Sequence, residues 1–287
     1  MYIMLCSIGN YIISLFQTDD VFCIITKLIF VILSAILTII IFRNTISRLS
    51  ISYKRRIIML QNFKESITKA VIKLKDPGSA ITHFIGMLMA IFAATPLILK
   101  CGENPDRIHI VSLSIFIISM ILLYAASTLH HSLKLSPKGD KLFKKIDHMM
   151  IFVLIAGTYT PICLIVLDKS IGIPLLILVW SIALAGIVIK ACWITCPKWF
   201  SSLLYIAMGW VCVLAFSQIF STLKGAAFGW LLTGGIIYTI GGVIYALKLP
   251  IFNNKHKYFG SHEIFHLFVM AGSFCHFILM YNFITKM

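Results

Sequence analysis

The sequence predicts an all-α, polytopic membrane protein whose main part is a seven-transmembrane helix bundle, with a candidate extra helix before it. The chain is 60% hydrophobic and 12% charged, whereas a soluble domain has about 25% charged residues. Its apolar residues also come in runs of about 20, which is enough to cross a bilayer as a helix. A soluble helical protein would leave such runs without the polar face that it needs.

Eight apolar runs are long enough to span a membrane. They lie at 22–42, 80–99, 109–131, 148–167, 172–192, 200–221, 227–247 and 261–284. Short loops join the last seven, so we expect residues 79–287 to form one seven-transmembrane domain. Residues 1–42 form a hydrophobic N-terminal extension, and residues 43–78 form a basic segment between the two.

The basic segment is predicted to form a helix on the membrane surface. Its apolar residues recur at helical spacing, and the positions between them are largely Lys and Arg. They are Leu60, Phe63, Ile67, Val71 and Leu74. A soluble linker helix is the alternative. The run at 22–42 contains Lys27 but is long enough to span, which would give eight helices and an outside N-terminus; translation from Met59 would leave seven.

Lysine and arginine predict the orientation of the helices. Their number in successive loops alternates between high and low, with nine before the span at 80–99, then two, then five. Cytoplasmic loops carry the excess, so we expect a multi-pass protein of the cell membrane with residues 43–78 in the cytoplasm and the C-terminus outside. Orientation also explains the formal charge of +15. We therefore expect membrane lipids as partners and no nucleic acid.

Polar residues converge on the cytoplasmic side of this arrangement. The last run begins with S-H-E-I-F-H at 261–266, which places His262 and His266 one helical turn apart, as in zinc metalloproteases. His131 ends the third run and Asp147 begins the fourth. The orientation brings these three helix ends to one depth. Ionisable groups inside a membrane are costly and are typical of functional sites.

The chemistry of these side chains suits zinc. Catalytic zinc commonly has three protein ligands and an open fourth position, and His131, His262 and His266 supply three nitrogens. Asp147 is placed to orient a zinc-bound water, whose pKa falls to about 7, or to accept its proton. Ser127 lies four residues before His131 on the same helical face. It is placed to donate a hydrogen bond in the site or to polarise a substrate carbonyl.

The same residues, taken singly, have ordinary interpretations. His131 is typical of an interfacial histidine, Asp147 of a helix cap, and the histidine pair of helix packing. His130 points about 100° away from His131, and His276 lies about 15 Å beyond His266. His130 is therefore the weaker ligand candidate. His276 is too distant to share the metal, and we interpret it as a buried, hydrogen-bonding histidine.

Three blocks of sequence carry a resemblance to a known family: S-T-L-H-H at 127–131, D-H-M-M-I-F-V-L-I-A-G-T-Y-T-P at 147–161 and S-H-E-I-F-H at 261–266. Further matches are I-T-H-F-I-G at 81–86 and L-T-G-G-I-I-Y-T-I-G-G-V-I-Y at 232–245. Over about 78–284 the chain resembles the bacterial branch of the hemolysin III family. That family belongs to the progestin and adipoQ receptor family, which includes the adiponectin receptors.

The resemblance implies seven helices and a zinc ion near the cytoplasmic face, held by His131, His262 and His266 with Ser127 and Asp147 beside it. It also implies an activity, because eukaryotic relatives are receptors reported to hydrolyse ceramide-like amides. We therefore expect zinc-dependent hydrolysis of a lipid amide or ester. The alternatives are a haemolytic, pore-forming cytolysin and a lipid-sensing receptor, with zinc in a structural role.

An intramembrane zinc protease is disfavoured. The metzincin continuation of H-E-x-x-H is absent, since Val269 and Gly272 occupy its positions, and no downstream acid supplies a third ligand. Glu263 is therefore not predicted to act as the base.

Overall fold

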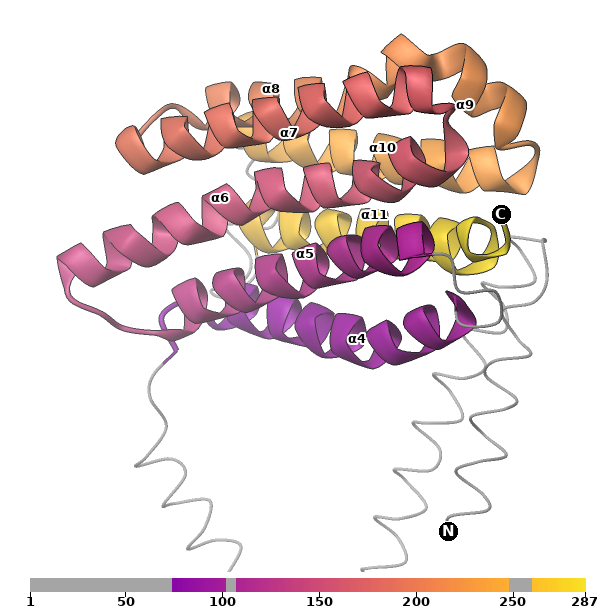
Figure 1. Cartoon of the computed structure of the whole chain (residues 1–287). Coiled ribbons are helices and arrows are strands. Elements are labelled where there is room, and N and C mark those ends of the chain that lie inside the picture. Colours follow the sequence, from indigo (N-terminus) through magenta and orange to yellow (C-terminus); the bar gives the residue numbers. More distant parts are fainter. Residues whose placement is uncertain (1–73, 102–106, 248–259) are drawn as a thin grey trace, which may run out of the picture. The chain divides into compact units, whose positions relative to one another are not determined.

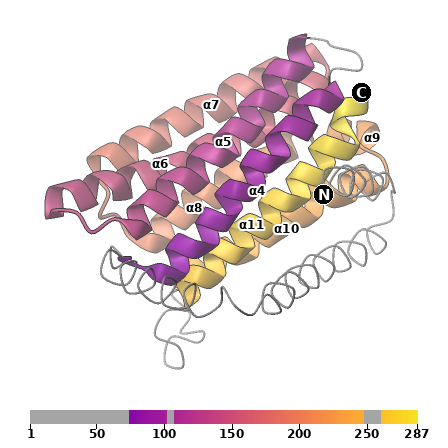
Figure 2. The same ribbon diagram turned by 90° about the horizontal axis from the view of Figure 1, so that it is seen from below.

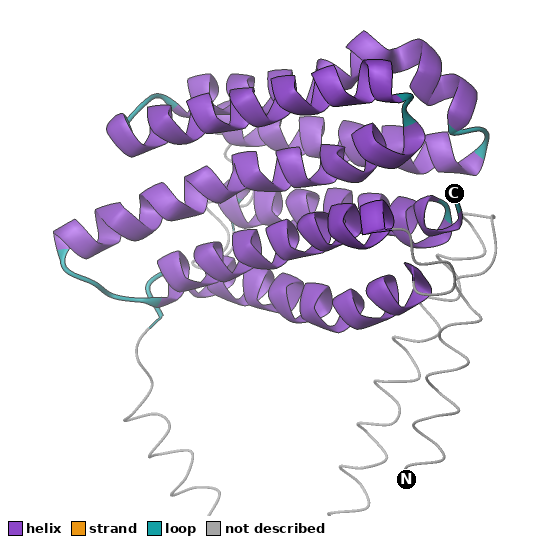
Figure 3. Ribbon diagram, viewed as in Figure 1, coloured by secondary structure: helices purple, strands orange, loops and turns teal. Residues whose placement is uncertain are grey.

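The computed structural model describes residues 74–101, 107–247 and 260–287, and within them every regular element is helical (Figures 1 and 3). The predicted N-terminal extension, residues 1–42, lies outside the described residues, as do the candidate start at Met59 and nearly all of the basic segment. The part that is described corresponds to the predicted seven-transmembrane domain.

Within the described residues, seven helices are long and apolar enough to cross a membrane, which confirms the predicted fold class. With the labels of Figure 1 they are α4 (Pro77–Cys101), α5 (Arg107–Ser132), α6 (Pro137–Pro161) extended by the π-turn η1 (Ile162–Val166), α7 (Lys169–Cys192), α8 (Lys198–Gly209) continued by the 3₁₀ segment η2 (Trp210–Ala215) and α9 (Phe216–Thr222), α10 (Ala226–Leu247), and α11 (Ser261–Asn282) ending in η3 (Ile284–Lys286).

The helices pack in chain order around the bundle. Each helix contacts the next, and α11 closes the arrangement by packing against both α10 and α4 (Figure 2). The first and last helices are therefore neighbours although they are far apart in the sequence. This closure brings the start of α11 beside the start of α4 and the end of α5.

Apolar side chains cover the outside of the bundle as well as its core. Phe92, Leu99 and Leu214 are exposed by 76%, 70% and 73%, while Phe116 and Ile278 are fully buried. A helix that is apolar all round is typical of a membrane span. The exposed side chains are therefore the lipid-contacting surface of a multi-pass membrane protein.

Small residues allow the helices that carry the polar residues to approach closely. A Cβ atom added at Gly157 of α6 would lie 2.2 Å from Ser119 Oγ of α5, and one added at Gly186 of α7 would lie 2.3 Å from the Phe152 ring of α6. Small residues at helix interfaces are how membrane helices come into van der Waals contact. These glycines set the spacing of α5, α6 and α7.

Helix α6 begins eleven residues before the predicted span at 148–167. Pro137 is its first residue, and Ser136 Oγ accepts a hydrogen bond from the Gly139 N–H at 3.4 Å. Pro is favoured in the first turn of a helix because it has no N–H to leave unpaired. Hydropathy found the part of α6 that is apolar enough for lipid, whereas Ser136 and Pro137 determine where the helix starts.

A buried lysine ties α7 to α8. Lys190 is 1% exposed, and its Nζ donates to Ser201 Oγ at 2.5 Å and to Cys196 Sγ at 3.0 Å. Burial raises the pKa of the Cys196 thiol, but the hydrogen bonds of Ser201 and Lys190 outweigh burial and hold that pKa below its usual value. The lysine thus stabilises the short turn between the two helices.

Candidate metal centre

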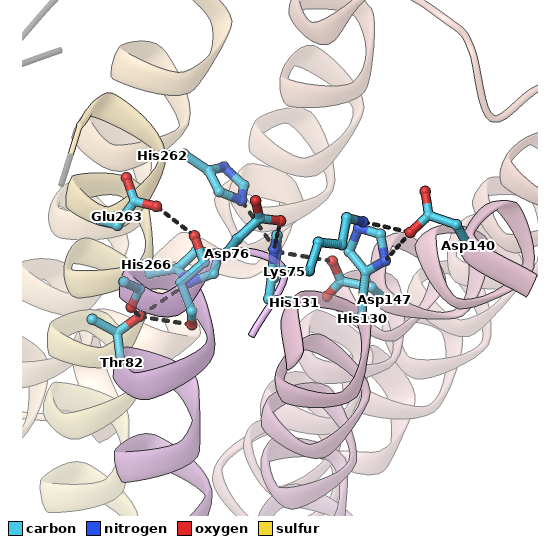
Figure 4. A network of polar contacts seen from close by, with 12 residues as sticks. Lys75, Asp76, Thr82, His130, His131, Asp140, Asp147, His262, Glu263 and His266 are labelled. Atoms are coloured by element: carbon cyan, nitrogen blue, oxygen red, sulfur yellow. Dashed lines mark hydrogen bonds and ion pairs between the residues drawn. The ribbon is translucent and has the colours of Figure 1, made fainter. Parts of the chain in front are cut away.

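Three predicted histidines meet at one end of the bundle. His131 comes from the end of α5, and His262 and His266 come from the first two turns of α11 (Figure 4). One ligand nitrogen from each lies within 4.8 Å of the other two. The end of the bundle that holds these residues, together with Asp76 and Asp147, is called the site end below.

The spacing of the nitrogens fits a shared metal ion. The Nε2 atoms of His131 and His262 are 3.3 Å apart. Two nitrogens bound at about 2.0–2.1 Å to a tetrahedral zinc ion lie about 3.3–3.4 Å apart. The His131 ring is centred 5.0 Å from the His262 ring and 5.3 Å from the His266 ring. The residues present therefore fit a three-histidine zinc site.

The other ring nitrogens of two of these histidines are already held. His131 Nδ1 lies 3.0 Å from Asp76 Oδ2, and His266 Nδ1 lies 3.2 Å from Thr82 Oγ1. Thr82 donates to backbone carbonyls, so its oxygen accepts from His266. Metal-binding histidines usually donate their second N–H to such a partner, which fixes the tautomer. In both rings Nε2 is thereby left for the metal.

Asp147 lies beside the cluster. Its Oδ2 is 3.9 Å from His131 Nε2, and its side chain is 13% exposed. At this separation the two groups do not hydrogen-bond to each other directly. Asp147 also belongs to a second group of potential metal ligands, together with His130 and His131. One ligand atom from each of the three lies within 4.8 Å of the other two.

Ser127 is fully buried one turn before His131. Its Oγ meets no partner at normal hydrogen-bond geometry among the described residues, although Asp147 lies near it, and it lines the same cavity as Asp147 and His262. A buried hydroxyl normally has a partner. The Ser127 hydroxyl is therefore a buried polar group in the wall of that cavity, beside the Asp147 carboxylate.

Glu263, the middle residue of H-E-x-x-H, is engaged in structural contacts. Its Oε2 accepts from the Gly260 N–H at 2.8 Å, and its Oε1 accepts from Ser79 Oγ at 2.6 Å. The first contact caps the start of α11, and the second joins α11 to α4 (Figure 4). Both carboxylate oxygens are therefore occupied away from the cluster.

Sequence reasoning missed the contribution of α4. Asp76 and Thr82 support the two histidines described above, and His83 stacks on His266 with ring centroids 3.6 Å apart and planes at 8°. His83 is 3% exposed, and neither of its nitrogens has a hydrogen-bond partner within the described part of the chain. The depth argument used for the other helices places the start of α4 at the same level, but it does not show that these side chains lie beside the histidines.

Asp76→Asn is expected to weaken zinc binding by about 10–100-fold, because outer hydrogen-bond partners of metal ligands have effects of this size. Competition titration against a chromophoric chelator measures the affinity. Asp168→Asn is the matched control, since Asp168 pairs with Gln218 away from the cluster. Equal affinities of the two variants would show that the Asp76–His131 contact does not support the metal.

A largely apolar cavity opens from the cluster into the bundle. His83, Ser127, Asp147, His262 and His266 line it at the site end. Further along, its walls come from α6, α8, η2, α9, α10 and α11, and they are mainly Ile, Leu, Val and aromatic side chains. An apolar cavity with a few convergent polar groups is the usual form of a small-molecule site.

The fold and this cluster define a class: an integral membrane protein whose described part is a seven-helix bundle with a candidate metal centre among its helix ends. The chain belongs to the Haemolysin-III related family, whose sequence model matches residues 72–277. The resemblance carried by the sequence blocks is thus confirmed.

Individual relatives agree with this placement. The chain is 38% identical to Hemolysin-3 of Bacillus cereus, over 73% of this chain and 92% of that protein. It is 40% identical to the Hemolysin-3 homolog of Bacillus subtilis (strain 168), over 69% of this chain and 89% of that protein. It is also 26% identical to the adiponectin receptor protein of Drosophila melanogaster, over 70% of this chain and 49% of the receptor.

Proposed function

We propose that this protein is a zinc-dependent hydrolase of lipid amides or esters with its active site inside the membrane. The observation that carries the proposal is the three-histidine cluster, with Asp147 beside it at 3.9 Å, at the mouth of an apolar cavity. His131, His262 and His266 would hold the zinc. Three protein ligands leave a fourth position open, as in catalytic rather than structural zinc sites.

The residues around the cluster have the chemistry that hydrolysis needs. Bound zinc would supply a hydroxide at neutral pH and polarise a carbonyl. The Asp147 carboxylate accepts the proton of the attacking water and returns it to the leaving amine or alcohol as general acid. The Ser127 hydroxyl donates a hydrogen bond to the substrate carbonyl oxygen as negative charge develops there. The cavity holds the acyl chain and keeps bulk water away.

We also place the site end in the cytoplasm. The described lysines at that end include Lys75 and Lys190. One more lies in the α5–α6 connection and four lie in the first turns of α6: Lys134, Lys138, Lys141, Lys144 and Lys145. Loops at the opposite end carry fewer basic residues, and an excess of them is typical of the cytoplasmic side. In this orientation residues 79–287 form the seven-transmembrane domain, with an outside C-terminus.

Two other functions follow from the names of relatives. A receptor that senses lipid would use the same cavity with zinc in a structural role, but it has no need of an open ligand position beside an acid. A cytolysin would need a polar path across the membrane, whereas the helices here are apolar on the outside and the cavity is lined mainly by apolar side chains. A hydrolase accounts for the open ligand position, the nearby acid and the apolar cavity together, whereas the receptor and the cytolysin do not.

The experiment is a turnover assay on purified full-length protein in lipid nanodiscs. We expect the zinc-loaded protein to release fatty acid from ceramide or from an ester lipid, to lose this activity after chelation, and to regain it when zinc is added. A protein with one zinc per chain that releases no fatty acid from ceramide, phospholipid or acylglycerol would contradict the hydrolase. Dye release from liposomes that persists without the three histidines would support the cytolysin.

A further inference from the structure

We propose that the cavity selects lipids that carry a hydroxyl group within the acyl chain, and that His276 binds this hydroxyl. The inference deepens the proposed function, on which it rests, by naming the substrate class. It is carried by a buried imidazole in a cavity whose other walls are mainly apolar and aromatic.

His276 lies deep in the same cavity as the histidine cluster. It is on α11 ten residues after His266, about 15 Å further along the helix, and it lines the cavity together with apolar residues of α10 and α11. A lipid whose scissile carbonyl sits at the cluster would pass along this wall. His276 would then contact the middle of the acyl chain.

The imidazole of His276 has unused hydrogen-bonding capacity. The residue is 5% exposed, and its Nδ1 is buried without a hydrogen-bond partner among the described residues. Buried polar atoms in proteins nearly always have a partner, so an unpaired one requires an explanation. Nδ1 itself is enclosed, so a molecule in the cavity meets the imidazole along the part of its edge that lines the cavity.

Neighbouring polar groups do not satisfy His276, because they bind one another. The Tyr124 hydroxyl donates to Ser273 Oγ at 2.8 Å, and the Tyr238 hydroxyl lies 2.8 Å from the same Ser273 oxygen. Tyr238 contributes only its ring face to His276, with centroids 5.4 Å apart and planes at 23°. The hydrogen bond to Ser273 thus holds the Tyr238 ring against His276. It leaves Nδ1 of His276 unpaired.

The imidazole ring is held in a defined position. A Cβ atom added at Gly234 of α10 would lie 2.8 Å from His276 Nε2, so the glycine makes room for the ring on one side while Tyr238 stacks on the other. A polar group fixed in advance binds its partner with little loss of conformational freedom. The ring is therefore suited to discriminate between ligands.

A hydroxyl is the group that best matches this position. An imidazole ring can donate from one nitrogen and accept at the other, and a hydroxyl both donates and accepts. A charged group would be costly among these apolar walls. Sites that hydrogen-bond a ligand hydroxyl strongly reject the analogue that lacks it.

The test compares two fatty acids that differ by one hydroxyl. Ricinoleic acid and oleic acid share their length and double bond, and in an extended chain the hydroxyl of ricinoleic acid lies about as far from the carboxylate as His276 lies from His266. Displacement of cis-parinaric acid from the purified zinc-loaded protein measures both affinities. We expect ricinoleate to bind at least about 10-fold more tightly, at the low end for recognition of a hydroxyl.

His276→Phe keeps an aromatic ring but removes both nitrogens, and it is expected to abolish the preference while zinc content stays unchanged. Gly234→Ala is the second variant: it keeps His276 but crowds Nε2, so it should reduce the preference. Gly235→Ala is its matched control, because a Cβ atom there meets nothing within 4 Å. Equal affinities in the wild type, or a preference that survives in His276→Phe, would overturn the proposal.

The binding test separates this inference from the hydrolase itself. If the protein prefers ricinoleate but cleaves neither N-ricinoleoyl nor N-oleoyl sphingosine, the proposed hydrolase activity is wrong. The selection for a hydroxyl would then belong to a lipid-sensing protein. If it cleaves both amides at equal rates and binds both acids equally, the hydrolase stands and the role of His276 is wrong.

Discussion

Alanine substitution of His131, His262 or His266 is expected to reduce bound zinc from about one ion per chain to a small fraction of that value. Each histidine supplies one of only three protein ligands, so its loss should weaken affinity by more than the roughly 100-fold seen at most for outer partners. Elemental analysis by mass spectrometry, on protein purified without added zinc, measures the content. His109→Ala, at the opposite end of α5, is the matched control.

His130→Ala decides between the two sets of ligand atoms that the structure brings together. If the metal sits among His131, His262 and His266, this variant keeps its zinc, because His130 lies on the side of Asp140, with Nδ1 4.0 Å from that carboxylate. If the metal sits among His130, His131 and Asp147, zinc is lost. Full zinc in any one of the three alanine variants of the predicted ligands would refute the proposed set.

The sequence predicted at which level of the bundle the site residues lie, but it did not predict which helices lie next to one another. Hydropathy locates each span and basic loops fix its direction, so the two signals together place His131, Asp147 and His262 at one level. Which helices stand side by side is decided by packing, for instance at Gly157 and Gly186. No local feature of the sequence indicates that α11 packs against α4.

The overlooked role of α4 follows from that limit. Asp76 precedes the first predicted span of the bundle by four residues, so hydropathy leaves it in a loop, and its contact with His131 depends on how α4 packs against α5. The same holds for the stacking of His83 on His266, which joins the first helix to the last. The I-T-H-F-I-G block is part of the family resemblance, but only the bundle gives its residues a position in the site.

Asp147→Asn is expected to lower kcat for lipid hydrolysis by about 10²–10⁴-fold, the usual contribution of general acid–base catalysis, while bound zinc stays near one per chain. The amide is close in size and keeps the polar contact, but it cannot accept a proton from water and return it to the leaving group. The measurement pairs a steady-state assay on ceramide in nanodiscs with zinc analysis of the same preparation. Loss of zinc along with activity would instead make Asp147 a ligand or a structural residue.

Glu263→Gln is the control that tests the meaning of H-E-x-x-H. The glutamine carbonyl can still accept from the Gly260 N–H or from Ser79, so the start of α11 should hold and hydrolysis should continue near the wild-type rate. A zincin requires the opposite result, because its glutamate is the general base. If Glu263→Gln abolished turnover and Asp147→Asn did not, the base would have to be reassigned, although both oxygens of Glu263 are held by α11 and α4 in this structure. The contacts of Glu263 and the 3.9 Å approach of Asp147 to His131 make Asp147 the expected base.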